Sequence, residues 1–233
     1  MKIGILEAET LPPSITEKFG GYAGMFERLL GTVDPTLSFQ LYAVDKLQLP
    51  GSIDDCDAYL LTGSRFSAYD HKPWITELQA FIREINQHKK KCIGICFGHQ
   101  LIAHTLGGLT QRSEKGWGIG AATSMVQHRP QWMEPNLQRF TLLVSHQDQV
   151  QSLPEDAVLI AGNDFCPIAA YQISNHMLCF QGHPEFSREY ARHLMEKRRA
   201  VIGEQRVDKA LSSLRAQTDE QSIAAGILAF LKS

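Results

Sequence analysis

The sequence lacks the features that mark secreted, membrane-spanning or nucleic-acid-binding proteins. Its 233 residues carry 23 Lys and Arg against 25 Asp and Glu, so a net charge of −2 provides no basic field for nucleic acid. No stretch approaches the roughly 18 apolar residues of a membrane span. The N-terminal segment MKIGILEAE has an acidic residue at position 7 where a signal peptide has a long apolar run. We therefore expect no nucleic-acid partner and no membrane association.

Cysteines and long runs of one charge are also scarce. The five cysteines are an odd number without the spacing of a disulfide framework, which is typical of a reducing compartment and predicts a cytoplasmic protein. The two short basic runs, Lys89–Lys91 and Lys197–Arg199, are typical of a solvated surface. No repeat, low-complexity tract or convincing linker divides the chain. We expect one domain over residues 1–233, with a core of about 1–200 and a helical extension of about 201–233.

The first half of the sequence alternates between strand and helix patterns. Buried strands are predicted at Lys2–Glu7, Phe39–Val44, Ala58–Leu61 and Cys92–Ile95, and helices at Gly21–Leu30, Trp74–Gln87 and Gln100–Leu106. The second half is predicted to be richer in strands, at Ala121–Val126, Thr141–Val144, Val158–Ala161, Ile168–Ile173 and Leu178–Gln181. A helix after Ser187 to about Ala200, a polar link and a helix over Ser222–Lys232 follow. This order predicts an α/β fold with a mostly parallel sheet and a small antiparallel addition.

The stretch GICFGHQ, residues 94–100, places a cysteine where a strand turns into a helix. Gly94 and Gly98 stand on either side of Cys96, and small neighbours suit a tight backbone. Such a corner, the nucleophile elbow, lifts the side chain out of the carboxyl edge of the sheet. The first amides of the following helix then stabilise a thiolate. The alternative is a cysteine that is buried on the strand only for packing.

A thiolate nucleophile needs an acid–base partner, and His183 is the best placed of the nine histidines. It follows a predicted apolar strand in FQGHPEF, where the catalytic edge of the sheet is expected. Glu185 comes two residues later, and in an extended chain such residues point to the same side. Its carboxylate can accept the Nδ1–H of the imidazole and leave Nε2 facing the thiol.

The third element of such chemistry is an oxyanion hole. The strand ending Leu60-Leu61-Thr62-Gly63-Ser64 has a glycine turn that can direct the backbone amides of Gly63 and Ser64 at an oxyanion. The amide of Phe97, next to the nucleophile, would be the second donor. A plain turn at the end of a strand explains the same residues equally well.

With GICFGHQ and GHPE both present, the chain resembles the class I (triad-type) glutamine amidotransferases over about residues 1–200. That family carries Gly-x-Cys-x-Gly-x-Gln at the elbow and His-x-Glu near the C-terminal end, and this chain is similar to stand-alone members that resemble the amidase domain of GMP synthetase. The resemblance implies a flavodoxin-like, three-layer α/β/α fold. It also implies that Cys96 attacks the γ-carboxamide of glutamine, His183 moves the proton and Glu185 orients His183. A γ-glutamyl thioester forms, ammonia leaves and water releases glutamate.

The resemblance extends to substrate contacts. It implies that Gln100 and the segment Ser145, His146, Gln147 hold the α-amino and α-carboxylate groups, a zwitterion that needs donors and acceptors together. The turn Lys115–Gly118 could line the same pocket, and the loop Arg65–Asp70 could cover it. We expect no cofactor and no metal site, since no zinc-like cysteine pair occurs.

Two departures from the family pattern keep alternatives open. The oxyanion strand ends in Thr-Gly-Ser where many relatives have a Gly-Gly-Pro-like turn, and no synthetase domain follows the core. An ammonia acceptor would therefore be a separate synthetase chain, or there is none. The leading prediction is a glutamine amidotransferase or glutaminase that acts on a small-molecule substrate. The alternatives are a γ-glutamyl peptidase acting on γ-glutamyl peptides or glutathione conjugates, and a non-catalytic regulatory module.

Overall fold

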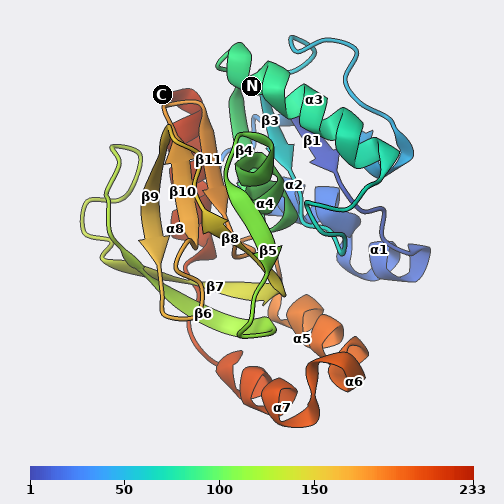
Figure 1. Cartoon of the computed structure of the whole chain (residues 1–233), viewed down its shortest axis with the longest axis vertical. Helices are drawn as coiled ribbons and strands as arrows, with labels where there is room; N and C mark the ends of the chain where they lie inside the picture. Colours follow the sequence, from blue (N-terminus) through green and yellow to red (C-terminus); the bar gives the residue numbers. More distant parts are fainter.

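A nine-stranded sheet runs through the computed structural model, which describes residues 1–233 (Figure 1). Its strand order is β2-β1-β3-β4-β11-β10-β9-β6-β7, and β5 and β8 form a separate two-stranded sheet. The strands are β1 (Lys2–Glu7), β2 (Ser38–Ala43), β3 (Ala58–Leu61), β4 (Lys91–Ile95), β5 (Leu109–Arg112), β6 (Gly118–Val126), β7 (Arg139–His146), β8 (Asp148–Ser152), β9 (Ala157–Gly162), β10 (Ala170–Ile173) and β11 (Met177–Phe180).

The sheet confirms the predicted α/β class. The five strands β2-β1-β3-β4-β11 are parallel to their neighbours. From β11 through β10, β9 and β6 to β7 the pairing is antiparallel. The antiparallel strands thus extend the sheet beyond β11, and ligands of open α/β sheets bind at the carboxyl ends of the parallel strands.

Helices cover both faces of the sheet. They are α1 (Pro13–Phe19), α2 (Gly21–Val33), α3 (Pro73–Gln87), α4 (Phe97–Thr105), α5 (Arg188–Lys197), α6 (Arg199–Ile202), α7 (Glu204–Ser213) and α8 (Glu220–Lys232), with a short 3₁₀ turn at Val44–Lys46. On β4, Ile93 and Ile95 pack in the core under α2 and α8, whereas Cys92 faces the core under α3 and α4. This alternation is what a strand buried on both faces requires.

Some predicted elements differ from the structure. The helix predicted to stop at Gly31 runs on to Val33, because a glycine at a spacious surface position weakens a helix by only about 1 kcal/mol. The predicted polar link contains α7, which buries Val207 and Ala210 in a hydrophobic cluster. The short elements α1, β5 and β8 were not predicted, because their sequences are mostly polar and tertiary contacts hold them. None of the helices is long and apolar enough to cross a membrane.

The register of three adjacent parallel strands assembles the site. Leu61 of β3 lies beside Gly94 of β4, and Ile95 of β4 lies beside Phe180 of β11. Parallel strands end at the same edge of a sheet, so the residues that follow β3, β4 and β11 meet there. Those residues include Gly63, Cys96 and His183, which are far apart in sequence.

Candidate active site

Cys96 occupies a strained corner between β4 and α4. Its φ of 52° and ψ of −98° lie in a region that costs a non-glycine residue about 1–3 kcal/mol. The corner is closed so tightly that a Cβ on Gly98 would lie 2.5 Å from the carbonyl oxygen of Leu61. A Cβ on Gly94 would lie 2.9 Å from the carbonyl carbon of Gly98. The two glycines are therefore required by the close approach of β3, β4 and α4, as the elbow prediction expected.

Three contacts fix the position of His183: one at the edge of its imidazole ring, one on the face of the ring and one through its backbone amide. Its Nδ1 lies 2.7 Å from Oε1 of Glu185, and both side chains are buried. The ring stacks on Phe186, with ring centroids 3.7 Å apart and planes 10° from parallel. The backbone amide of His183 donates a 2.8 Å hydrogen bond to the carbonyl of Leu143 in β7. These contacts leave the imidazole little freedom to rotate.

The imidazole lies beside the elbow and the β3 turn. A Cβ built on Gly63 would lie 2.8 Å from Cε1 of His183 and 3.7 Å from Cβ of Cys96, so the three residues meet at one point of the sheet edge. Burial by itself lowers the pKa of His183, but the Glu185 carboxylate and the nearby Cys96 sulfur together raise it to about 10. A protonated imidazole is therefore favoured at neutral pH.

The turn after β3 is fixed by hydrogen bonds to its Thr62 and Ser64 side chains. The Ser64 hydroxyl donates to the carbonyl of Ala8 at 3.0 Å, and the Thr62 hydroxyl accepts from the amide of Ala8 at 3.0 Å, which fixes the turn. The amides of Gly63 and Ser64 donate no hydrogen bond within the chain. Phe97 is the first residue of α4, so its amide has no acceptor inside the helix. All three predicted donors thus lie near Cys96 with their hydrogen-bonding capacity unused.

A cleft of about 310 Å³ brings the predicted substrate-binding residues together with the cysteine: it is lined by Cys96, Gln100, Ser145, His146 and Gln147. The side-chain nitrogen of Gln100 donates to the carbonyl of Asp148 at 2.8 Å and to Oε1 of Gln181 at 3.1 Å. Gln100 therefore ties the segment after β7 to the elbow helix, and its amide oxygen is left for a ligand.

His146 and Gln147 are fixed by their own partners. Nδ1 of His146 lies 3.0 Å from the carbonyl of Asp148, and burial lowers the pKa of His146 to about 4, so the ring is neutral. With its amide turned so that the oxygen faces Arg112, the Gln147 side chain accepts hydrogen bonds from the guanidinium, at 2.7 Å from Nη2 and 3.0 Å from Nε. The backbone of the segment is consequently held rigidly beside the cleft.

Arg198 is a cleft residue that the sequence did not reveal. The basic run Lys197–Arg199 predicts a solvated surface, yet Arg198 lines the cleft together with Trp117. Nη1 of Arg198 donates a 3.1 Å hydrogen bond to the hydroxyl of Ser145, and its guanidinium carbon lies 5.5 Å from the centre of the Trp117 ring. A basic run carries no local signal that separates a cleft residue from a surface one.

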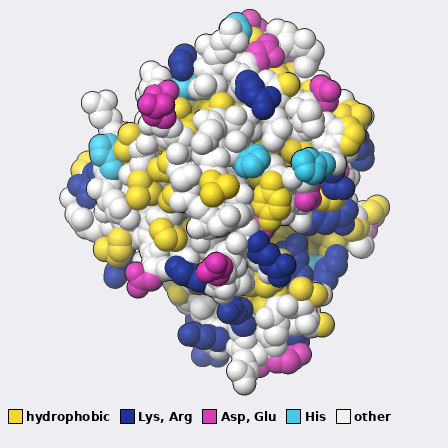
Figure 2. Space-filling view, in the orientation of Figure 1, with side chains coloured by type: hydrophobic (Ala, Val, Ile, Leu, Met, Phe, Trp, Pro, Cys, Tyr) yellow, Lys and Arg dark blue, Asp and Glu magenta, His cyan; other side chains and the backbone are white.

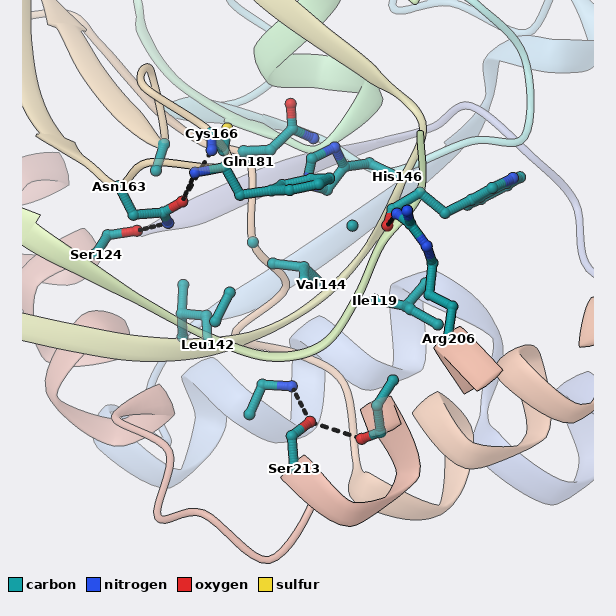
Figure 3. A pocket seen from close by; sticks show the side chains of 18 of the residues that line it. Ile119, Ser124, Leu142, Val144, His146, Asn163, Cys166, Gln181, Arg206 and Ser213 are labelled. Atoms are coloured by element: carbon teal, nitrogen blue, oxygen red, sulfur yellow. Dashed lines mark hydrogen bonds between the residues drawn. The ribbon is translucent and has the colours of Figure 1, made fainter. Parts of the chain in front are cut away.

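A larger cavity of about 570 Å³ adjoins the cleft, and Trp117 and His146 line both spaces. In Figure 3, Leu142 and Val144 rise from β7 toward the side chains of Gln181 and His146. The wall is mostly apolar, but the side-chain nitrogen of Gln181 is buried there without a hydrogen-bond partner. A cavity of this size therefore lies next to the cleft that contains Cys96.

Comparisons with known proteins identify the family of the chain. The family profile "Glutamine amidotransferase class-I" matches residues 39–201. Gamma-glutamyl peptidase 2 of Arabidopsis thaliana is 29% identical over 208 residues, which cover 86% of this chain and 83% of that one. A glutamine amidotransferase-like protein of Schizosaccharomyces pombe is 30% identical over 98% of both chains.

The fold has counterparts among solved structures as well. A glutamine amidotransferase from Methylobacillus flagellatus superposes with a TM-score of 0.77 at 23% identity, over 99% of this chain and 94% of that one. At 23% sequence identity this structural similarity supports the fold alone, and the fold is the predicted one. The sequence match over most of the chain speaks for the family. The protein belongs to the class I glutamine amidotransferases and is a cysteine-dependent amidohydrolase.

Proposed function

We propose that the protein hydrolyses γ-glutamyl amides through a triad of Cys96, His183 and Glu185. The observation that carries this proposal is the buried 2.7 Å contact between His183 and Glu185 next to the elbow that presents Cys96. An imidazole that a carboxylate orients beside a cysteine sulfur is the arrangement that nucleophilic catalysis requires.

In the proposed reaction, the Cys96 sulfur attacks the γ-carbonyl carbon of the substrate. The amides of Phe97 and of the Gly63–Ser64 turn bind the oxyanion, and removing one such donor typically costs about 10²–10³ in rate. The protonated His183 gives its Nε2 proton to the leaving amine, and a γ-glutamyl thioester remains. His183 then takes a proton from water, whose oxygen attacks the thioester carbon, so that glutamate leaves and the Cys96 thiolate is restored beside a protonated His183.

We propose γ-glutamyl peptides as the substrate class, ahead of glutamine. The support is that gamma-glutamyl peptidases 2 and 3 of Arabidopsis thaliana align with this chain over more than four-fifths of both chains. Both substrate types offer the same γ-glutamyl acyl group, and only the leaving amine differs. Glutamine hydrolysis that supplies ammonia to a separate synthetase chain is the second candidate, and the family name and the amidotransferase-like relative support it.

The test compares glutamine, γ-glutamyl dipeptides and glutathione as substrates of the wild type and of Cys96→Ala. We expect a kcat/KM at least about tenfold higher for the peptides and loss of all turnover in Cys96→Ala, because no other group supplies the nucleophile. Cys56→Ala is the matched control, since Cys56 is also buried but lies in the core under α3, away from the cleft. Turnover retained by Cys96→Ala would remove Cys96 from the mechanism. A slow rate on glutamine that rises with a partner protein would favour the second candidate.

A further inference from the structure

We infer that Arg198 binds a carboxylate on the leaving amine, so that the preferred substrates are γ-glutamyl amides of amino acids. This inference rests on the proposed function and specifies its substrate. Hydrolysis would add water across the γ-amide bond and release glutamate and a free amino acid. Arg198 would act as a specificity residue, because it would touch the substrate without taking part in the bond changes.

The charge of Arg198 has no partner within the chain. Its guanidinium contacts the Ser145 hydroxyl at 3.1 Å and the face of Trp117, both of which are uncharged. The next residue, Arg199, differs, since it pairs with Glu196, Glu204 and Asp208 at 2.7–2.8 Å. A fixed and half-buried guanidinium that lacks a carboxylate is suited to accept one from a ligand.

The depth of the cleft separates the two halves of the substrate. Gln100 and His146 form its floor and are each 3% exposed, next to the buried elbow. The rim includes Val201, which is 76% exposed, and the side chain of Arg65, which is 65% exposed. The constant γ-glutamyl head fits the floor, where the predicted head-group residues lie. The leaving amine must then extend toward the rim, where Arg198 lies beside Val201.

The charges of the cleft match such a substrate. Among the lining residues Asp148 is the sole acid, and Arg65 and Arg198 are the cations. Figure 2 shows Lys and Arg side chains gathered along the edge of a hollow beside the helices α5–α7. Glutamine carries one ammonium and one carboxylate group, whereas a γ-glutamyl amino acid carries a second carboxylate. Because Glu9 already contacts Arg65, at 3.6 Å, Arg198 is the cation available for that second group.

The test uses two substrates that differ only in this carboxylate, γ-glutamylglycine and γ-glutamylethylamide. In Arg198→Met we expect kcat/KM for γ-glutamylglycine to fall about tenfold to hundredfold, through KM more than kcat, because a charge-assisted hydrogen bond is lost. The values for γ-glutamylethylamide and glutamine should stay within about twofold. Arg198→Lys should recover part of the loss, since the charge remains but the paired geometry does not. Lys197→Met is the matched control, because it removes a neighbouring charge outside the cleft.

Two results would overturn the inference while leaving the proposed function intact. Equal losses on both substrates in Arg198→Met and Arg198→Lys would assign Arg198 to the glutamyl half, and equal kcat/KM values in wild type and both variants would remove it from recognition. Circular dichroism spectra that match the wild type would show that each variant is folded. A wild-type protein that hydrolyses none of the γ-glutamyl amides would contradict the proposed function, and the inference with it.

Discussion

At the scale of single residues, glycines decide where the reactive groups can lie. Gly63 has no side chain at the point where the His183 ring passes closest to the β3 turn. The ring is also stacked against Phe186, with 3.7 Å between centroids, which limits how far it can move. Gly63 therefore has two roles in the proposed site. Its lack of a side chain leaves space for the imidazole, and its backbone amide is a proposed donor to the oxyanion.

Gly63→Ala should consequently impair the reaction strongly. The added methyl group would lie 2.8 Å from Cε1 of His183 and push the ring from its position beside Cys96. Misplacement by about 1 Å can cost about 10²-fold, and we expect a loss of this size in kcat/KM. Steady-state kinetics on γ-glutamylglycine provide the measurement. Gly31→Ala is the control, since an added Cβ there meets nothing within 4 Å, and it should leave the kinetics unchanged. An unimpaired Gly63→Ala would show that the ring has other room.

At the scale of elements, the last helix is part of the main core. The buried cluster that contains Ile3 of β1 and Ile93 of β4 also includes residues of α8, such as Ile223, Ile227 and Phe230. The Lys91 ammonium at the start of β4 donates to the carbonyl of Phe230 at 2.8 Å and lies 4.5 Å from the centre of its ring. The strand β4, which leads to Cys96, thus packs against the C-terminal helix α8.

Phe230→Ala should destabilise the fold as a large-to-small core substitution does. We expect the free energy of unfolding to fall by about 3–5 kcal/mol, because a buried ring is replaced by a cavity. Urea unfolding followed by circular dichroism gives this value. Ala225→Gln, at an exposed position of the same helix, should change it by no more than about 0.5 kcal/mol. A loss below about 1 kcal/mol in Phe230→Ala would mean that α8 is not integral to the core.

At the scale of the whole molecule, buried histidines whose pKa values are shifted in opposite directions make the stability of the fold depend on pH. Burial lowers the pKa of His99 to about 3 and that of His146 to about 4, so both are neutral in the folded protein. Burial also lowers the pKa of His183, but Glu185 and Cys96 outweigh it and raise the value to about 10. Each shift links protonation to folding, with opposite signs.

We therefore expect the free energy of unfolding to be greatest near neutral pH. Below about pH 6.5 the unfolded chain binds protons that the folded His99 and His146 do not, so stability is lost as the pH falls toward 4. The contribution of His183 is complete below about pH 6.5 and is lost as the pH rises through 10. Urea unfolding at a series of pH values measures both limbs. His99→Phe should flatten the acid limb and His128→Gln, at an exposed site, should not; identical slopes in both would contradict the assignment.

Much of the fold and of the candidate site follows from local sequence patterns. The strand patterns at Lys2–Glu7 and Ala58–Leu61 and the N-cap at Ser187 agree with the structure, since periodicity and capping are properties of neighbouring residues. The elbow at Cys96 was readable for the same reason, because its glycines are close in the chain. The pairing of His183 with Glu185 was also readable, since the two residues are two positions apart.

The remaining features of the fold and of the site are determined only by the tertiary structure. The approach of His183 to Cys96 depends on the register of β4 and β11, strands that lie more than 80 residues apart in sequence. The order of the antiparallel strands, the packing of α7 and the unpaired charge of Arg198 in the cleft depend on which surfaces meet. Local patterns therefore specify the reactive groups and the elements that carry them. The shape and charge of the cleft arise from contacts between segments that are far apart in the sequence. A polar or basic residue in such a contact leaves no periodic pattern in the sequence that would predict it.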